Sequence, residues 1–202
     1  HERIWGIDPY MIGKKPGVGG VIFFKKGEMI KAYGADAGKI TYRASGSGAV
    51  SSGGLAKGEF FHSYYWIFAD SYENHVKTYA DFGKEILSSD ILIAPGVQKF
   101  ANASMIKNER DGYIIIWGSP EKEYGIIGTA LLWNPEKSVG FYENEDGFFI
   151  KLKADNNFSA EYKSVAVWNR ASADLPDSPK DFENYIKSLS EKFRNPVKIV
   201  IN

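Results

Sequence analysis

Residues 56–85 read AKGEFFHSYYWIFADSYENHVKTYADFGKE, a stretch that is rich in aromatic residues, contains no Pro and has Gly only near its ends. This composition is typical of long consecutive strands in an antiparallel sheet. In the second half polar and apolar residues alternate, so His75, Lys77 and Tyr79 share one face of the predicted strand. The first half has aromatic residues on both faces, which predicts a strand covered on both sides. We therefore expect this pair of strands at the centre of a β-sandwich.

Length and composition limit the class of protein. The chain has 202 residues, enough for a single β-sandwich domain over residues 1–202. It contains 25 Lys and Arg against 25 Asp and Glu, so no overall field attracts nucleic acid or an anionic membrane, and we expect neither as a partner. The absence of Cys excludes disulfides, thiolate metal sites and cysteine nucleophiles.

The start of the chain carries no targeting signal. No apolar run approaches the ~20 residues of a membrane span, and no signal peptide is present. The chain begins at His1 rather than Met, and we interpret it as a processed, cloned or truncated product whose targeting segment is missing.

Turn-forming residues divide the rest of the chain into short strands. We expect these at residues 21–24, 29–33, 39–43, 86–97, 113–117, 124–133, 139–142, 148–153, 162–168 and 197–201. Pro95-Gly96 is expected to stop the strand in which it lies. Residues 44–55, ASGSGAVSSGGL, predict a mobile connection, with a flexible loop over a binding cleft as the alternative. Residues 1–20 and 101–112 are also predicted to be loops.

One helix is expected, near the carboxyl end. Ser178 is suited to be its N-cap and Pro179 its first helical residue, and apolar residues then recur at helical spacing up to Asn195. An amphipathic helix in an otherwise all-β chain is expected to pack across a sheet face or an open end of the sandwich.

Five short motifs and one predicted helix stand out together: residues 8–13 (DPYMIG), 17–20 (GVGG), 26–28 (KGE), 166–169 (AVWN) and 194–199 (RNPVKI), and the helix between the last two. In these features the chain resembles the C-terminal portion of the Domain of Unknown Function 4861 family. This resemblance implies a large antiparallel sandwich of the galactose-mutarotase-like kind, found in bacterial proteins associated with the breakdown of plant or algal polysaccharides, pectin-like uronic-acid polymers among them.

The resemblance also implies what is missing. Family members are longer and have an N-terminal half before the Asp8 region, so this chain would be the C-terminal part of a longer domain. The missing half or a second chain would then complete the sandwich. The family supplies no catalytic residue, and Asp8 and Tyr10 are candidate substrate-binding residues only because they match the motif.

Two His residues are candidates for catalysis, since His1 is terminal and is discarded. His62 lies in an aromatic run, where a cleft would hold its pKa near neutrality; the alternative is a buried, hydrogen-bonded His. His75 has Glu73 and Lys77 two residues away on its own predicted face, and a His-carboxylate pair would serve as general acid and base in a sugar ring-opening or lyase step. The alternative is a solvated strand.

Five Trp residues are candidate platforms for a sugar ring: Trp5, Trp66, Trp117, Trp133 and Trp168. Trp168 is followed closely by Arg170, and a Trp beside an Arg suits a uronate, which carries a carboxylate. The alternative is a core Trp at a strand end. No motif predicts a metal or another cofactor, and we expect none.

These patterns favour a carbohydrate-active β-sandwich that acts on or binds uronic-acid-containing poly- or oligosaccharides. His75 or His62 would be the general acid/base of a lyase, hydrolase or epimerase step, and Trp168 and Arg170 would bind the substrate. Two alternatives stay open: a non-catalytic glycan-binding module, and a structural fragment that completes a partner chain. We expect secretion or a periplasmic location.

Overall fold

The computed structural model describes residues 15–33, 40–45, 48–55, 59–67, 71–119, 125–171 and 176–196. The strands are β1 (Val18–Lys25), β2 (Glu28–Lys31), β3 (Ile40–Ser45), β4 (Gly48–Gly54), β5 (Phe60–Ile67), β6 (Glu73–Asp81), β7 (Ile91–Gln98), β8 (Ser104–Asn108), β9 (Tyr113–Gly118), β10 (Ile127–Trp133), β11 (Ser138–Glu143), β12 (Gly147–Lys153) and β13 (Ser159–Trp168). They form a 5-stranded sheet in the order β11-β12-β7-β1-β2 and an 8-stranded sheet in the order β3-β4-β5-β6-β13-β10-β9-β8.

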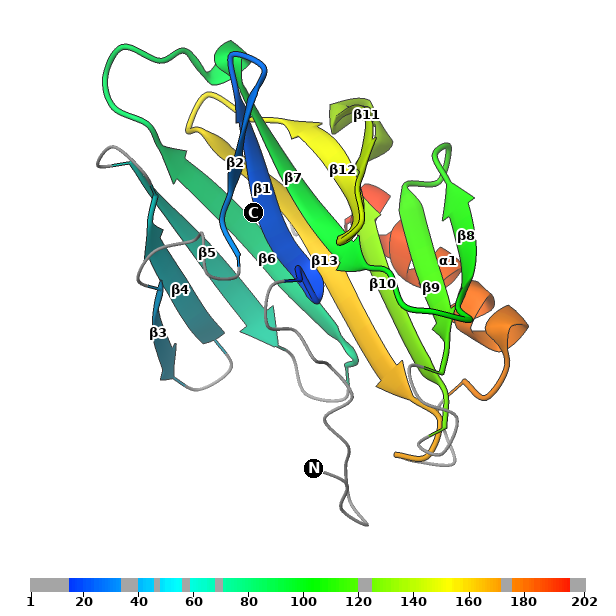
Figure 1. Ribbon diagram of the computed structural model, residues 1–202. Helices are drawn as coiled ribbons and strands as arrows, with labels where there is room; N and C mark the ends of the chain where they lie inside the picture. The colour runs from blue at the N-terminus through cyan, green and yellow to red at the C-terminus, as the bar shows by residue number, and fades with distance from the viewer. Residues whose placement is uncertain are drawn as a thin grey trace, which may run out of the picture.

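The two antiparallel sheets lie face to face, with the smaller sheet in front in Figure 1. Alternate residues of both sheets meet in one apolar layer, in which Phe23, Ile93 and Leu131 are at most 1% exposed. Tyr162 is buried in the same layer, and its hydroxyl donates to the carbonyl oxygen of Gly19 on β1 at 3.0 Å. The expected antiparallel β-sandwich is therefore confirmed.

The helix α1 (Pro179–Arg194) covers the other face of the large sheet, behind β9 and β10 in Figure 1. Phe182 and Ile186 on its apolar stripe are fully buried against Tyr113 and Leu132 of those strands. The predicted helix is confirmed, and it packs across a sheet face. The same face of the large sheet continues past β9 and β10 to β6, β5 and β4.

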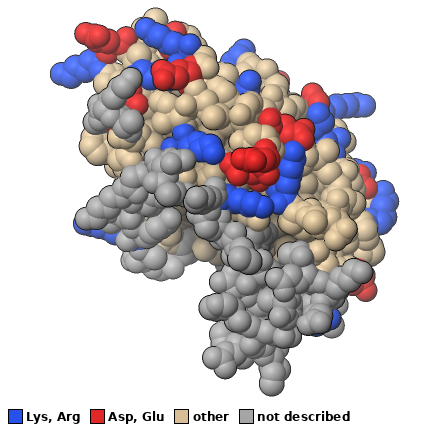
Figure 2. Space-filling view, in the orientation of Figure 1, with Lys and Arg blue, Asp and Glu red and all other residues tan. Residues whose placement is uncertain are grey.

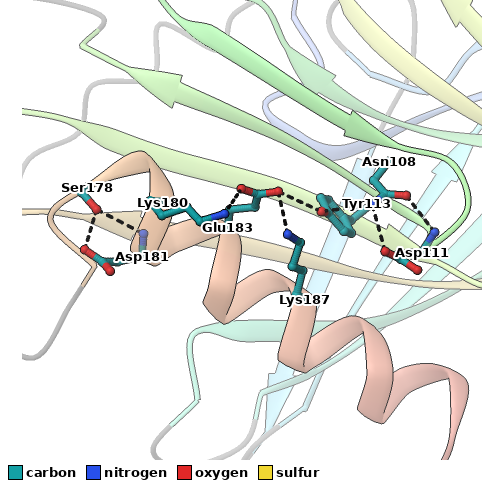
Figure 3. Close-up of polar contacts among 8 residues, drawn as sticks. All are labelled: Asn108, Asp111, Tyr113, Ser178, Lys180, Asp181, Glu183 and Lys187. Atoms are coloured by element: carbon teal, nitrogen blue, oxygen red, sulfur yellow. Dashed lines mark hydrogen bonds and ion pairs between the residues drawn. The ribbon is translucent and has the colours of Figure 1, made fainter.

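Polar contacts fix both the start and the middle of α1. Ser178 is the N-cap, since its hydroxyl accepts the backbone N–H of Asp181 at 3.1 Å. Glu183 accepts from the Tyr113 hydroxyl at 3.2 Å and pairs with Lys187 at 3.0 Å (Figure 3). These contacts lie along one side of the helix and secure it to β9.

Two predicted loops are strands. Residues 44–55 include β4, because the small residues there let a neighbouring ring pack directly on the strand: a Cβ on Gly53 would lie 2.4 Å from the Phe61 ring. Residues 101–112 include β8, which pairs with β9 along its whole length. Both predictions were wrong because composition alone does not show a cross-strand partner.

The strand predicted over residues 86–97 is β7, which continues through Pro95 and Gly96. Pro95 pairs with Val21 next to an irregularity in the β1 register, where a missing N–H is tolerated. Gly96 lies beneath the Phe149 ring, and a Cβ added to Gly96 would lie only 2.3 Å from that ring. The predicted stop at Pro95 was therefore wrong.

The outer face of β5 is open rather than covered. Phe60 is 50% exposed and Trp66 is 38% exposed. We predicted that β5 would be covered on both faces, and this prediction was wrong. The predicted pairing of β5 with β6 is confirmed. The strand predicted at residues 197–201 lies outside the described residues.

The outward face of the small sheet carries charge of both signs. Charged side chains on the side shown in Figure 2 gather in small mixed groups. Two ion pairs, Lys31–Asp146 and Lys99–Glu143, hold the turn between β11 and β12. A broad patch of one sign is not visible on the described part of this side.

Candidate functional site

The open face of the large sheet beside α1 is the candidate site, and we call it the outer-face site. Strands β4, β5, β6 and β13 pair there without a register shift, which aligns residues in rows across the strands. The three rows are Gly48–Trp66–His75–Lys163, Val50–Tyr64–Lys77–Glu161 and Ser52–His62–Tyr79–Ser159. Arg43 on β3 pairs with Val50 and extends the second row.

The aromatic part of the site lies on β5 and β6. The Tyr64 and Trp66 rings are nearly parallel, with centroids 6.1 Å apart. The Tyr64 and Tyr79 rings are packed edge to face, with centroids 5.6 Å apart. Tyr64 and Trp66 are both more than a third exposed. Gly48 is the neighbour of Trp66 on β4 and has no side chain to cover it. Exposed aromatic rings are suited to stack on the C–H face of a sugar.

An open groove of about 710 Å³ runs along this aromatic surface. Its lining residues are Arg43, Gly48, Ala49, Val50, Tyr64, Tyr65 and Trp66. Arg43 is exposed, and among the described residues it has no carboxylate within ion-pair distance. Its guanidinium is therefore available to an anionic ligand in the groove.

His75 lies at the end of the aromatic surface that is nearest to α1. Trp66 and Phe193 contact its ring edge-on, each with ring centroids 5.7 Å away. The His75 Nε2 atom is 3.6 Å from an oxygen of Glu161, an electrostatic contact longer than a direct hydrogen bond. Lys77 pairs with the other oxygen of Glu161 at 2.9 Å.

Burial lowers the pKa of His75, and it outweighs the opposing effect of Glu161. Lys163 and Lys77, both cations, also favour the neutral ring. The imidazole is therefore neutral at pH 7 and able to accept a proton.

The spacing in the sequence suggests Glu73 as the carboxylate beside His75, but in the structure this carboxylate is Glu161. Glu73 shares the face, but it accepts from Lys163 at 3.1 Å and from the Tyr185 hydroxyl at 3.3 Å. Burial raises the pKa of Glu73, but hydrogen bonds from Ser71, Lys163 and Tyr185 outweigh it and hold that pKa below its ordinary value. Glu73 therefore serves to anchor α1.

His62 lies on the same face as His75, two rows away along β5 and β6. It is exposed, and its Nδ1 atom is 2.8 Å from the Ser52 hydroxyl. Tyr79 is its partner on β6. The structure thus places both candidate catalytic residues on one surface. His75 lies among aromatic rings and a carboxylate, whereas the described hydrogen-bond partner of His62 is a Ser hydroxyl.

The predicted Trp168–Arg170 pair lies elsewhere. Trp168 pairs with Ile127 at the end of β13, in the register that faces the small sheet, so it is on the opposite face from His75. Arg170 is exposed in the turn that follows. The structure does not bring these residues to the outer-face site, and Asp8 and Tyr10 lie outside the described residues.

Two other candidate platforms are core residues. Trp117 and Trp133 are buried, at 5% and 1% exposure, and Trp5 lies outside the described residues. Three residues of the site were missed from sequence: Arg43, Tyr64 and Glu161. Alternation along each strand indicates the face of Tyr64, but the neighbours of Arg43 and Glu161 follow from pairing over long sequence separations.

The described ranges also show what the site lacks. They contain no group of three or more His, Asp or Glu side chains close enough to hold a metal ion. Among these residues, no helix has the length and apolar character that crossing a membrane requires.

The fold and the site define a two-sheet antiparallel β-sandwich with an exposed aromatic groove beside a half-buried His. A family model described as "Domain of unknown function (DUF4861)" matches residues 1–199, so the chain belongs to this family. Comparison with curated proteins and with solved structures finds no match.

Proposed function

We propose that this protein binds acidic, uronic-acid-containing glycans of the pectin type on the outer-face site, as a bacterial β-sandwich of the galactose-mutarotase-like kind. The observation that carries the proposal is the exposed Tyr64–Trp66 surface in the same groove as Arg43, which has no ion-pair partner among the described residues. Such a protein would act on extracellular or periplasmic polysaccharide, in line with the expected location.

The charges around the groove favour an acidic ligand over a neutral one. Lys77 is held by Glu161 and Lys163 by Glu73, so both of these cations are already neutralised. Arg43 is the groove cation without a described partner. A planar guanidinium binds a carboxylate through two parallel hydrogen bonds, while the aromatic rings bind the apolar side of the pyranose.

Calorimetry with oligogalacturonides and with neutral oligogalactans of equal length tests this proposal. We expect Trp66→Ala to weaken binding of both ligands by roughly tenfold, since it removes the stacking surface. Arg43→Met should weaken binding of the acidic ligand alone, because it removes the charge and keeps the length of the side chain. Arg43→Lys should restore part of that loss.

Trp168→Ala is the informative comparison, because Trp168 lies on the opposite face of the same sheet. A loss of binding in Trp168→Ala with none in Trp66→Ala would place the glycan on the inner face and overturn the proposed site. Binding that does not distinguish acidic from neutral glycans would remove the role of Arg43.

A catalytic step is the second candidate, and the His75–Glu161 contact favours it. A neutral imidazole would take the proton from the sugar carbon that carries the carboxylate. In an epimerase the proton returns on the other side of that carbon. In a lyase the electron pair forms a C=C bond, the glycosidic C–O bond breaks, and the departing oxygen takes up a proton.

Mass spectrometry of oligouronides incubated with the protein separates an enzyme from a binding module. We expect His75→Ala to abolish any turnover, and His62→Ala to change it less. Rates that stay unchanged from the unmodified protein in both variants would remove the imidazole mechanism. Glycan binding without any product in the unmodified protein would leave the non-catalytic binding module.

A further inference from the structure

A second cleft adjoins the outer-face site on the far side of Glu161. Its volume is about 290 Å³, and it lies where β13 begins and β10 and β12 end, beside the last turn of α1. It is lined by Asn134, Lys137, Leu152, Lys153, Asp155, Ser159, Ala160, Glu161 and Phe193.

Glu161 and Phe193 belong to both sites. Each lines the second cleft, and each also contacts His75, Glu161 at 3.6 Å and Phe193 through ring centroids 5.7 Å apart. In the row across the sheet, Glu161 follows Lys77, which follows Tyr64 of the groove. The His75–Glu161 contact therefore lies between the aromatic groove on one side and the second cleft on the other.

The second cleft holds charges of both signs, and its carboxylate oxygens are already engaged by groups of the protein. Asp155 is satisfied by its own turn, where its oxygens accept from the backbone N–H groups of Asn157 and Ser159 and from the Ser159 hydroxyl. The Glu161 carboxylate is held by Lys77.

The two cations of the second cleft have no such partner in the part of the chain that the structure describes. Lys137 and Lys153 line it, and within the described ranges neither has a carboxylate at ion-pair distance. The Asn134 side chain, by contrast, accepts the backbone N–H of Glu136 through its oxygen. Two ammonium groups without a described carboxylate partner, beside an aromatic ring, are suited to a ligand with an apolar face and a negative charge.

We propose that the second cleft is a binding subsite for one further acidic sugar residue of the same chain, with its carboxylate between Lys137 and Lys153. The ligand would then run from the Tyr64–Trp66 surface across the His75–Glu161 contact and into the cleft. This inference rests on the proposed function and adds that the ligand is an oligosaccharide rather than a monosaccharide.

The volumes of the two cavities fit this arrangement. The second cleft is at the lower end of the range of small-ligand pockets, about 300–1,000 Å³, so it accommodates one sugar residue rather than a chain. The aromatic groove, at about 710 Å³, accommodates more of the chain. Affinity should therefore rise with ligand length until the cleft is reached, and then level off.

Calorimetry with mono-, di-, tri-, tetra- and hexagalacturonate, on the full chain, tests the proposal. In the unmodified protein we expect affinity to rise by at least tenfold at the length that first fills the second cleft. In the Lys137→Met/Lys153→Met variant this rise should disappear, while the shortest ligand that binds keeps its affinity. Lys84→Met/Lys151→Met removes two positive charges outside both cavities and should leave the length profile unchanged.

The outcomes separate this inference from the proposed function. No binding of any galacturonate by the unmodified protein overturns both. Binding that is lost in Arg43→Met but shows no dependence on length, or a length profile that the Lys137→Met/Lys153→Met variant keeps, overturns the subsite alone. Inorganic phosphate is the last probe: if it binds the cleft and Lys137→Met/Lys153→Met abolishes that binding without changing the length profile, the cleft is a free-anion site.

Discussion

At the scale of single residues, His75 has the most informative surroundings. Two rings, one carboxylate and two ammonium groups face it from β5, β6, β13 and α1. Its pKa is lower in the folded protein than in the unfolded chain, so between the two values the native state binds fewer protons. The contribution of His75 to stability is therefore present above about pH 6.5 and is lost as the pH falls through the folded pKa.

Glu161→Gln should lower the pKa of His75 further. The substitution removes a carboxylate that favours the imidazolium, while Lys77 and Lys163 still oppose it. NMR titration of the imidazole carbon-bound protons measures the shift, and the His62 resonance, which comes from an exposed ring two rows away, is the internal control. A His75 pKa that rises or stays constant in Glu161→Gln would show that Glu161 does not act on His75.

At the scale of elements, local patterns predicted the strands that have large alternating side chains and the single helix. They failed at β4, which was predicted to be a loop, and at the predicted stop within β7; in these places Gly53 and Gly96 lie beneath the rings of Phe61 and Phe149. In both cases a Gly that indicates a turn when read locally is needed for a cross-strand contact. That the strand continues through such a Gly follows only from its partner, which lies elsewhere in the sequence.

The same limit applied to the candidate site. Alternation correctly placed His75 and Lys77 on one face, because it depends on neighbouring residues alone. Glu161 is 86 residues from His75 in sequence (161 − 75), and only the β6–β13 register brings it close. Trp168 was assigned to the site by its neighbour Arg170, but the parity of β13 turns it to the opposite face.

Gly53→Ala should destabilise the protein, whereas Gly54→Ala should not. An added Cβ at Gly53 would lie 2.4 Å from the buried Phe61 ring, but at Gly54 the nearest atom, on Phe60, is 3.7 Å away. We expect a loss of about 1–3 kcal/mol of unfolding free energy for Gly53→Ala from overpacking, and a change within about 0.5 kcal/mol for Gly54→Ala. Urea unfolding measures both, and equal effects would mean that Phe61 moves aside without cost.

At the scale of the whole molecule, the large sheet separates two different environments. One face is sealed against the small sheet, while the other is covered by α1 over β9 and β10 and left open over β4–β6. Because α1 ends beside β13, Phe193 closes one side of the open region and brings the helix into contact with His75. Placement of the helix thus determines the limits of the outer-face site.

Hydroxyl groups link the large sheet to β1 across the sealed face. Burial holds the pKa of Tyr162 well above its ordinary value, so its hydroxyl remains protonated and donates to the Gly19 carbonyl at 3.0 Å. The same hydroxyl is 3.4 Å from Thr78 Oγ1, which is in turn 2.8 Å from Ser63 Oγ. The link therefore extends from β1 through β13 and β6 to β5.

Tyr162→Phe should therefore weaken the association of the two sheets. The substitution leaves the Gly19 carbonyl buried without its partner, at a cost of about 1–3 kcal/mol of unfolding free energy. Tyr65→Phe is the matched control, because Tyr65 is half-buried and its described hydrogen bond, at 3.3 Å, is to Ser51 of the same sheet; the loss of that bond should cost about 0.5 kcal/mol. Urea unfolding of both variants gives the comparison. If Tyr65→Phe cost as much as Tyr162→Phe, the contact between the sheets would add nothing beyond an ordinary hydrogen bond within one sheet.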